Sequence, residues 1–192
     1  VTVEEAIGDL PLIERDYTRQ RRPYQTPPRG PYQVYCRSDA PTEVSMHIGR
    51  PLSVQAGKLA KFIGQGEGLR AVPVAHLPER FKRMRRIANG ELRRDCTTLY
   101  HRISPNSPSY TITCNYKNVA SGPFLHPHED RAISHREAAR FMSFPDHFEF
   151  VGAAIPRQIG NSVPPLLARA IGSHIFEILR GDADRVQHYQ VA

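Results

Sequence analysis

The sequence contains few cysteines, and their spacing argues against two common ways of stabilising a small domain. Cys36, Cys96 and Cys114 are the three cysteines among 192 residues, and they form neither a Cys-x-x-Cys motif nor any other paired spacing. Neither a disulfide framework nor a zinc site is therefore expected. Unpaired thiols are typical of a reducing compartment, so we expect a cytoplasmic protein.

Long hydrophobic runs are also missing. No stretch approaches the roughly 20 consecutive apolar residues that a membrane-spanning helix needs, and the N-terminus lacks the apolar segment of a signal peptide. We therefore expect no membrane partner. The chain begins at Val1 without a methionine, so we expect it to be processed or cut from a longer sequence.

Acidic residues are outnumbered by basic ones, 19 against 26, which gives a formal charge of +7. Such a charge fits a polyanionic partner such as DNA, although it also fits a merely solubilising surface. The positions of the charges favour the first interpretation, since clustered cations suit phosphate contact. One short cluster consists of Arg80, Lys82, Arg83, Arg85, Arg86, Arg93 and Arg94.

The length suits one domain, or one and a half, with a moderate core.

Regular secondary structure is limited by proline. Prolines recur through residues 17 to 57, where we expect loops and short strands. Alternation of apolar and polar residues predicts one strand at Tyr32 to Arg37. Residues 76 to 87 are expected to form a helix that carries part of the arginine cluster on one face, with a solvated charged face as the alternative.

Two stretches invite functional interpretations that their context does not support. Gly64 to Gly68 is glycine-rich like a phosphate-binding loop, but it lacks the flanking strand and the Lys-Ser/Thr that such loops require. His126 to Asp130, with His135 nearby, is the one stretch that suggests a metal. Its histidines are separated by proline and have no obvious third ligand, so no metal site is expected.

Helix signals dominate the two ends of the chain. Thr2 with Glu5, and Ser134 with Glu137, have the spacing of capping boxes, which predicts a helix start at each. The second helix should be short, about two to three turns, because Pro145 disfavours a helical conformation at the preceding residue.

A further helix is predicted after Gly160-Asn161-Ser162, a turn of small polar residues. Pro164-Pro165 suits a first helical turn, where a missing amide costs nothing. The apolar residues that follow recur at helical spacing. They are Leu166, Leu167, Ala170, Ile171, Ile175, Ile178 and Leu179.

Together these two sequence motifs resemble the last two conserved blocks of the DNA (cytosine-5) methyltransferases, in their usual order and near their usual spacing. The matching residues are Arg136-Glu137-Ala138-Ala139-Arg140 with Phe144-Pro145-Asp146, followed by Arg157-Gln158-Ile159-Gly160-Asn161-Ser162-Val163-Pro164-Pro165. Two such phrases in order are far less expected by chance than one short motif.

The resemblance implies a mixed α/β fold. Residues 1–20 would be the exit segment from a catalytic domain, because Ala6 to Pro11 is similar to that segment of the family. Residues 21–133 would form a small, irregular, β-rich target-recognition region. Residues 134–192 would hold the conserved Arg-Glu helix and the Gly-Asn-Ser-Val-Pro-Pro helix. The last helix would complete a Rossmann-like, S-adenosylmethionine-dependent methyltransferase domain.

The resemblance also implies a cofactor site. Asn161, Ser162 and Val163 match the turn that borders S-adenosylmethionine in this family. A turn of small residues before a helix offers amide donors to a carboxylate such as the methionine end of that donor. A simple helix cap is the alternative for Asn161.

Contacts to duplex DNA are expected from residues of two kinds. Ser109 to Cys114 alternates like a strand and resembles the element that ends the family's variable segment, where a threonine contacts the backbone beside the displaced cytosine; Thr111 and Thr113 remain alternatives. The arginines expected at DNA are Arg83, Arg85, Arg86, Arg102 and Arg136. Arg136 has a second possible role, bracing the recognition region, and Glu137 is expected only to cap.

The residues that perform the chemistry in this family are not in the sequence. Methylation of cytosine C5 needs a cysteine nucleophile and an acidic group at N3, which the family takes from Pro-Cys-Gln and Glu-Asn-Val. No cysteine here follows a proline, since the preceding residues are Tyr35, Asp95 and Thr113. We therefore expect no catalytic residue in this chain and an N-terminal catalytic part as its partner, in the same polypeptide or as a separate subunit.

Two hypotheses follow. The first is the C-terminal part of a DNA (cytosine-5) methyltransferase, at the bacterial nucleoid, inactive alone and with an apolar row on its last helix left uncovered. The second is a freestanding DNA-binding module derived from such an enzyme. The sequence specifies neither the target DNA sequence nor whether a restriction nuclease accompanies the enzyme.

Overall fold

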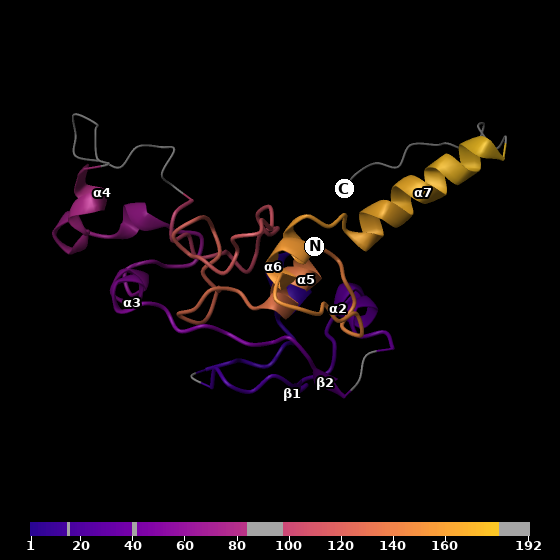
Figure 1. Ribbon diagram of the computed structural model, residues 1–192, viewed down its shortest axis with the longest axis horizontal. Coiled ribbons are helices and arrows are strands. Elements are labelled where there is room, and N and C mark those ends of the chain that lie inside the picture. The colour runs from indigo at the N-terminus through magenta and orange to yellow at the C-terminus, as the bar shows by residue number, and fades with distance from the viewer. Residues whose placement is uncertain (15, 40–41, 84–97, 181–192) are drawn as a thin grey trace.

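The computed structural model describes residues 1–14, 16–39, 42–83 and 98–180 (Figure 1). In these ranges short helices outnumber strands, and most of the chain between them is irregular. In chain order the elements are α1 (Val3–Ile7), β1 (Arg22–Pro23), α2 (Pro31–Cys36), β2 (Glu43–Val44), α3 (Val54–Ala60), the 3-10 helices η1 (Leu69–Ala71) and η2 (Val74–His76), α4 (Glu79–Arg83), α5 (His135–Phe141), α6 (Ile155–Gly160) and α7 (Pro165–Leu179).

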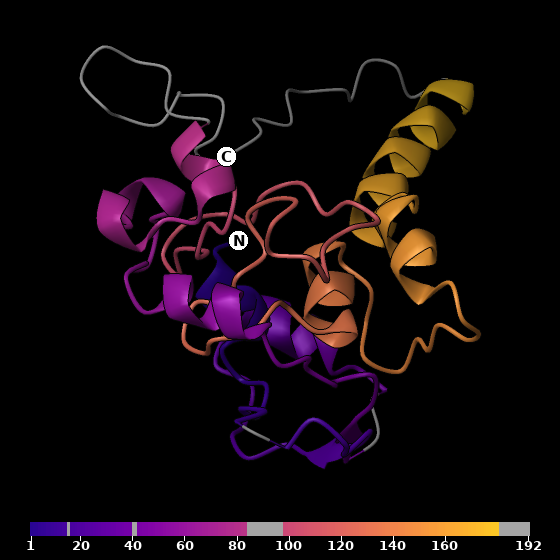
Figure 2. The same cartoon turned by 60° about the vertical axis from the view of Figure 1, so that its left-hand side comes forward.

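The first hydrophobic core joins the two ends of the chain. Helix α1 packs against α2 and α5, and α5 packs against α6, so the N-terminal helix lies among elements from the conserved C-terminal phrases (Figures 1 and 2). Val3, Ala138, Ala139 and Ile159 are fully buried there. The sequence-distant phrases are therefore held in one body by apolar burial.

A second core supports the middle of the chain. Helix α3, the two 3-10 helices and α4 surround a cluster that includes Leu59, Leu69 and Phe81. The Phe81 ring meets the Tyr100 ring edge-on at a centroid distance of 5.7 Å. This cluster lies apart from α7, at the opposite side of the molecule in Figure 1.

Strands are sparse in the described ranges. β1 and β2 pair antiparallel, with Arg22 opposite Val44 and Pro23 opposite Glu43. Isolated bridges join Pro51 to Arg131, Arg102 to Leu125, and Leu125 to Ala132. The mixed helix-and-sheet class is confirmed, and the region expected to recognise the target is irregular, with only these short pairings among its described residues.

The strand predicted at Tyr32 to Arg37 is wrong, because this segment is helix α2. Gly30 is the N-cap and Pro31 occupies the first turn, where proline is favoured. Gln33 and Cys36 face inward at helical spacing, while Val34 is exposed. Packing on α1 has overridden a weak alternation of apolar and polar residues.

Both predicted capping boxes are confirmed. In α1 the Glu5 amide donates to Thr2 Oγ1 at 3.2 Å, and the Thr2 amide donates to Glu5 Oε2 at 2.7 Å. In α5 the same exchange joins Ser134 and Glu137. Helix α5 ends at Phe141 with Met142 as its C-cap, before Pro145, as predicted. Of the helix expected at 76–87, the structure describes α4, and residues 84–87 lie outside the described ranges.

Helix α7 projects from the rest of the molecule in both views (Figures 1 and 2). None of its residues is buried. The predicted uncovered row is confirmed, since Leu167, Ile171, Ile175 and Ile178 are between 49% and 52% exposed. No helix within the described ranges is long and apolar enough to cross a membrane.

Candidate functional site

Glu137 does more than cap α5. Its carboxylate accepts the Ser134 amide at 2.7 Å and also binds the Arg131 guanidinium at 2.8 Å and 2.6 Å. His126 Nε2 lies 3.4 Å from it. Burial alone would raise the pKa of this carboxyl, but Arg131 and His126 hold its pKa well below the ordinary value. The expectation of a cap alone is therefore too narrow.

Arg136 is fully buried and braces the protein rather than contacting DNA. Its guanidinium donates to the Ser45 carbonyl at 3.1 Å, the Pro145 carbonyl at 3.1 Å and the Phe148 carbonyl at 3.0 Å. The expectation that Arg136 reaches a phosphate is corrected, because its donors are already satisfied inside the protein. Its second expected role, as a brace, is the one seen.

Arg102 is corrected for the same reason. It is 7% exposed and donates to the carbonyls of Ile63 and His126 at 2.9 Å each and of Ala60 at 3.2 Å. It also pairs with Asp130 at 2.5 Å. Arg102 thereby fastens the end of α3 to the His126–Asp130 loop, and it has no surface to offer a DNA strand.

Arg140 joins α5 to the N-terminal segment and to the loop that follows α5. Its guanidinium pairs with the Asp9 carboxylate, donates to the Ala6 carbonyl at 2.9 Å, and pairs with Asp146 at 2.9 Å and 2.6 Å. All these groups are buried. Burial would raise the pKa of Asp146, but Arg140 and the Tyr24 hydroxyl lower it below the ordinary value. The network holds the N-terminal segment against α5.

The expected cofactor turn follows the C-terminus of α6. Asn161 is the C-cap, and its amide donates to the Arg157 carbonyl at 3.1 Å. The Ser162 amide and hydroxyl both donate to the Ile159 carbonyl, at 3.2 Å and 2.7 Å. Two donors remain without an acceptor in the described part of the chain, the Asn161 side-chain amide and the Val163 amide. These two donors can receive a carboxylate.

The same turn touches the segment that ends at Cys114. Cys114 Sγ lies 3.2 Å from Asn161 Oδ1 and donates to it. A Cβ placed on Gly160 would fall 2.4 Å from the Cys114 amide nitrogen and 2.7 Å from the Thr113 carbonyl carbon. Only glycine permits this approach of two backbones. The segment expected to meet DNA and the turn expected to meet the cofactor are therefore in direct contact.

Thr111 and Thr113 lie on an extended segment with Ile112 between them. Both threonines are exposed, and Ile112 is buried in the first core. The strand expected at residues 109–114 is not assigned: Ile112 is buried between two exposed threonines, but Tyr110 is 44% exposed. The two hydroxyls are open to a ligand, and the structure leaves both as candidates.

Of the basic cluster, Arg83 is exposed at the end of α4, while Arg85 and Arg86 lie outside the described residues. Lys82 pairs with Glu79 at 2.7 Å. Arg80 donates to the Tyr100 hydroxyl at 3.2 Å. Of the described members, Arg80 and Lys82 therefore bind other protein groups, and Arg83 is exposed.

His126, considered above as a metal ligand, is engaged in the protein. Its Nδ1 accepts the amides of His128 at 3.2 Å and Glu129 at 3.0 Å. Within the ranges that the structure describes, no group of three or more His, Cys, Asp or Glu residues could hold a metal.

Sequence reasoning missed three features of this site. Helix α6 was not predicted, although Pro156 in its first turn and the buried Ile159 gave a weak signal. The Cys114–Asn161 contact and the Arg140 network had no signal, because each joins residues that lie far apart in the chain.

The chain is similar to known proteins over most of its length. The family model of the C-5 cytosine-specific DNA methylases matches residues 53–177. The Type II methyltransferase M.AgeI of Thalassovita gelatinovora is 31% identical over 219 residues, covering 91% of this chain and 50% of that protein. DNA (cytosine-5)-methyltransferase 2 of Arabidopsis thaliana is 32% identical over 193 residues, covering 93% of this chain and 12% of that protein.

A shorter relative is matched over most of its own length. The Type II methyltransferase M.AquIB of a Picosynechococcus species is 33% identical over 123 residues, which cover 55% of this chain and 85% of that protein. That relative is thus little longer than the matched segment, whereas this chain spans about half of M.AgeI.

Among solved structures, one assigned as a DNA modification methyltransferase encoded within a prophage (E. coli) superposes with a TM-score of 0.62 and 22% identity. The match covers 94% of this chain and 47% of that one. This likeness shows that nearly the whole chain shares the fold of about half of that structure.

Proposed function

The chain belongs to the C-5 cytosine-specific DNA methylases, and from that premise we propose that it is the DNA-recognition and cofactor-pocket-completing part of a DNA (cytosine-5) methyltransferase. The complete enzyme would transfer a methyl group from S-adenosylmethionine to C5 of cytosine in duplex DNA. An N-terminal catalytic part, in the same polypeptide or as a separate subunit, would supply the cysteine nucleophile.

The observation that carries this proposal is the uncovered face of α7. A 15-residue helix with no buried residue and a row of half-exposed isoleucine and leucine side chains is not stable on propensity alone. Its apolar row needs a partner surface. The turn that precedes it carries Asn161 and Val163, so a partner that covers α7 would also border that turn.

The donors left in the turn fit the amino-acid end of S-adenosylmethionine. The Asn161 side-chain amide and the Val163 amide would hold the methionine carboxylate, since both are donors without an acceptor in the described ranges. When bound, the cofactor supplies an electrophilic methyl group. Ser162 holds the turn closed through the Ile159 carbonyl and contributes to the pocket by shape rather than by donation.

For the DNA, we propose that Thr111 or Thr113 contacts the backbone beside the displaced cytosine. Both hydroxyls are exposed while Ile112 anchors the segment in the core. Arg83, with Arg85 and Arg86, would add sequence-independent phosphate contacts. The buried Arg102 and Arg136 would act only by holding the recognition region in place.

Whether the catalytic part lies on the same polypeptide is a separate question. M.AquIB, of which the match covers 85%, supports the possibility that a segment of this kind stands as its own chain. The roughly half coverage of M.AgeI supports the single-polypeptide arrangement. The alternative of a freestanding, non-catalytic DNA-binding module leaves the apolar row of α7 without a purpose.

Transfer of labelled methyl groups tests the proposal. The purified chain alone should transfer none to a cytosine-containing duplex, because it lacks the nucleophile. Mixed with an N-terminal part that contains Pro-Cys-Gln and Glu-Asn-Val, it should gain transfer that neither part shows alone. Transfer by the chain alone, or none with any matching N-terminal part, would count against the assignment.

A further inference from the structure

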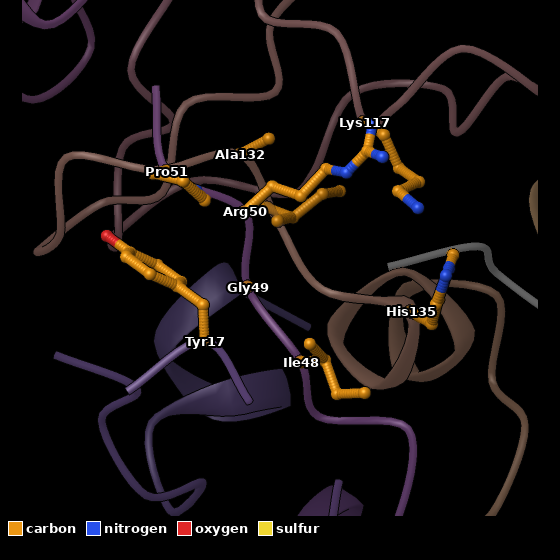
Figure 3. A pocket seen from close by; sticks show the side chains of 9 residues that line it. Tyr17, Ile48, Gly49, Arg50, Pro51, Lys117, Ala132 and His135 are labelled. Atoms are coloured by element: carbon orange, nitrogen blue, oxygen red, sulfur yellow. The ribbon is translucent and has the colours of Figure 1, made fainter. Parts of the chain in front are cut away.

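A basic pocket lies beside the start of α5. It has a volume of about 290 Å³ and is lined by residues 48–51, Lys117, Ala132, Ile133, His135 and Tyr17. These segments come from the loop before α3, the turns after Thr113 and the start of α5. Figure 3 shows Arg50, Lys117 and His135 grouped on one side of the pocket, with the Tyr17 hydroxyl pointing away.

The pocket has cations but no carboxylate in its lining. Arg50 and Lys117 make no hydrogen bond or ion pair with any residue in the described ranges. The buried arginines treated above behave differently, since Arg102, Arg131 and Arg140 are each paired with a carboxylate. Arg50 and Lys117 therefore form a positive site that none of the described residues neutralises.

These charges act on one another. Burial and the neighbouring Arg50 lower the pKa of Lys117 below its ordinary value. Burial, together with Lys117 and Arg50, lowers the pKa of His135 to about 4. Burial is the larger cause of both shifts, and repulsion among the three groups adds to it. An anion placed between the groups would relieve that repulsion.

His135 can still donate into the pocket as a neutral ring. The Tyr116 side chain is fully buried, and its hydroxyl contacts His135 Nδ1. A buried phenol needs an acceptor for its proton, and Nδ1 is the partner that this hydroxyl has among the described residues. With Nδ1 accepting, the ring proton resides on Nε2, which makes His135 a third donor beside Arg50 and Lys117.

The backbone holds this arrangement in place. A Cβ on Gly49 would meet Arg131 Cδ at 3.0 Å and the Ile13 and Tyr17 side chains at 3.2 Å each. Gly49 thus lets its segment lie tightly against the paired Arg131. Pro51 forms a bridge with Arg131 on the other side of Arg50, so Arg50 extends from a segment fixed at both neighbours.

We propose that Arg50, Lys117 and His135 form a binding site for a phosphate group. A tetrahedral phosphate presents its oxygens in several directions, so it can accept hydrogen bonds from three donors placed around it. Two sources share this chemistry, a backbone phosphate of duplex DNA and a free phosphate. The DNA source rests on the function proposed above, because Lys117 follows closely after Thr113, one of the two threonines proposed to contact the backbone.

Titration of the full chain with inorganic phosphate, followed by calorimetry and by the His135 ring resonances, tests the site. The wild-type chain should bind phosphate and shift the His135 signals, while chloride at equal ionic strength should not. In the Arg50→Gln/Lys117→Gln variant, affinity should fall by about tenfold or more, the value of one or two charge-assisted hydrogen bonds. These side chains make no hydrogen bond or ion pair with the described residues, so this variant should keep a melting temperature close to that of the wild type.

The matched control is Lys58→Gln/Lys61→Gln, which removes the same charge from exposed positions on and just after α3. Its phosphate affinity should stay close to that of the wild type. Equal affinities in the pocket variant and this control, or a titration that leaves the His135 signals unmoved, would overturn the proposal.

Duplex binding at several salt concentrations distinguishes the sources. If the pocket receives a DNA phosphate, the plot of log affinity against log salt should be shallower for the pocket variant than for the control, by about 0.9 in the magnitude of its slope. An unchanged slope with lost phosphate binding supports the site and assigns it to a free phosphate. A chain that restores methyl transfer but shows no pocket-dependent phosphate binding rejects the pocket alone.

Discussion

Asn161 is the residue at which the proposed recognition segment and the proposed cofactor turn meet. Its carbonyl oxygen accepts from Cys114 Sγ at 3.2 Å, and its side-chain NH₂ group has no acceptor in the described ranges. The oxygen of the side-chain amide therefore binds within the protein, and its NH₂ group remains available to a ligand.

In the reconstituted enzyme, Asn161→Ala should raise KM for S-adenosylmethionine by about tenfold or more, because one charge-assisted hydrogen bond is lost. The affinity for DNA should change little. Cys114→Ala is the control, since it removes the contact to Asn161 but leaves the amide. If Cys114→Ala raises KM equally, or if Asn161→Ala lowers only the melting temperature, Asn161 positions or caps the turn and does not hold the cofactor.

Gly160 offers a second test at this scale. The methyl group of Gly160→Ala would fall on the backbone of Thr113 and Cys114, which cannot move aside as a flexible side chain could. The expected cost is about 1–3 kcal/mol of unfolding free energy, typical of overpacking. Gly172→Ala in α7, where a Cβ meets nothing within 4 Å, should instead be neutral or stabilise by up to ~1 kcal/mol. Equal urea unfolding curves for both variants would contradict the close approach.

The arginines show where sequence reasoning fails at the scale of residues. A charged side chain is expected at the surface unless it is paired. Most partners of Arg102 and Arg136 are backbone carbonyls of other segments, which no local pattern marks, and Arg102 also pairs with Asp130. The DNA contacts expected for these two residues were therefore wrong. The capping partners were predictable because they lie three residues apart. The cofactor role expected for Asn161 stays a prediction.

At the scale of elements, α5 is the helix around which the ion pairs are arranged. Glu137 in its first turn binds Arg131, and Arg140 in its last turn binds Asp9 and Asp146. Replacement of one buried partner would leave an uncompensated charge. The helix start and end followed from the capping box and Pro145, whereas the network required the fold, because its partners come from α1 and from loops.

His47 makes the stability of this element depend on pH. The ring is fully buried, with Nε2 at 2.7 Å from the Pro11 carbonyl and Nδ1 at 3.0 Å from Ser134 Oγ. Burial lowers its pKa from 6.5 to about 4. Below pH 6.5 the unfolded chain therefore binds a proton that the folded chain does not, and stability should fall toward pH 4, by on the order of 3 kcal/mol from this group.

The carboxylates add a later stage. Glu137 and Asp146 have lowered pKa values in the folded chain, so their contribution is present above the ordinary carboxyl pKa and is lost as the pH falls below it. Urea unfolding from pH 7.5 to pH 3 should show both stages. His47→Gln should remove part of the loss between pH 6.5 and 4 and leave the later stage. A variant with the full early loss would exclude His47 as a source.

Prediction of elements from sequence succeeded where a local signal was strong and failed where packing decided. The helix at α7 had a long apolar period and was predicted. The segment at α2 had a short alternation, and its burial against α1 produced a helix instead of a strand. Helix α6 is six residues long, too short for its period to stand out.

At the scale of the whole molecule, the chain has two cores and one helix that belongs to neither. The first core draws α1, α2, α5 and α6 together, and the second supports α3 and α4. Helix α7 extends away from both in each view (Figures 1 and 2). This arrangement fits a helix whose apolar row is covered by a catalytic partner. That α7 is covered by such a partner is the central claim of the proposed function.

Amide hydrogen exchange of residues 165–179 tests that claim most directly. In the isolated chain the α7 amides should exchange quickly, because no tertiary contact buries the helix. Addition of the N-terminal catalytic part should slow them by about tenfold or more, the effect of at least 1.4 kcal/mol of added protection, while the α5 amides, already in the core, should change little. Slow exchange of α7 in the chain alone, or no change on mixing, would contradict the claim that this helix completes a methyltransferase domain.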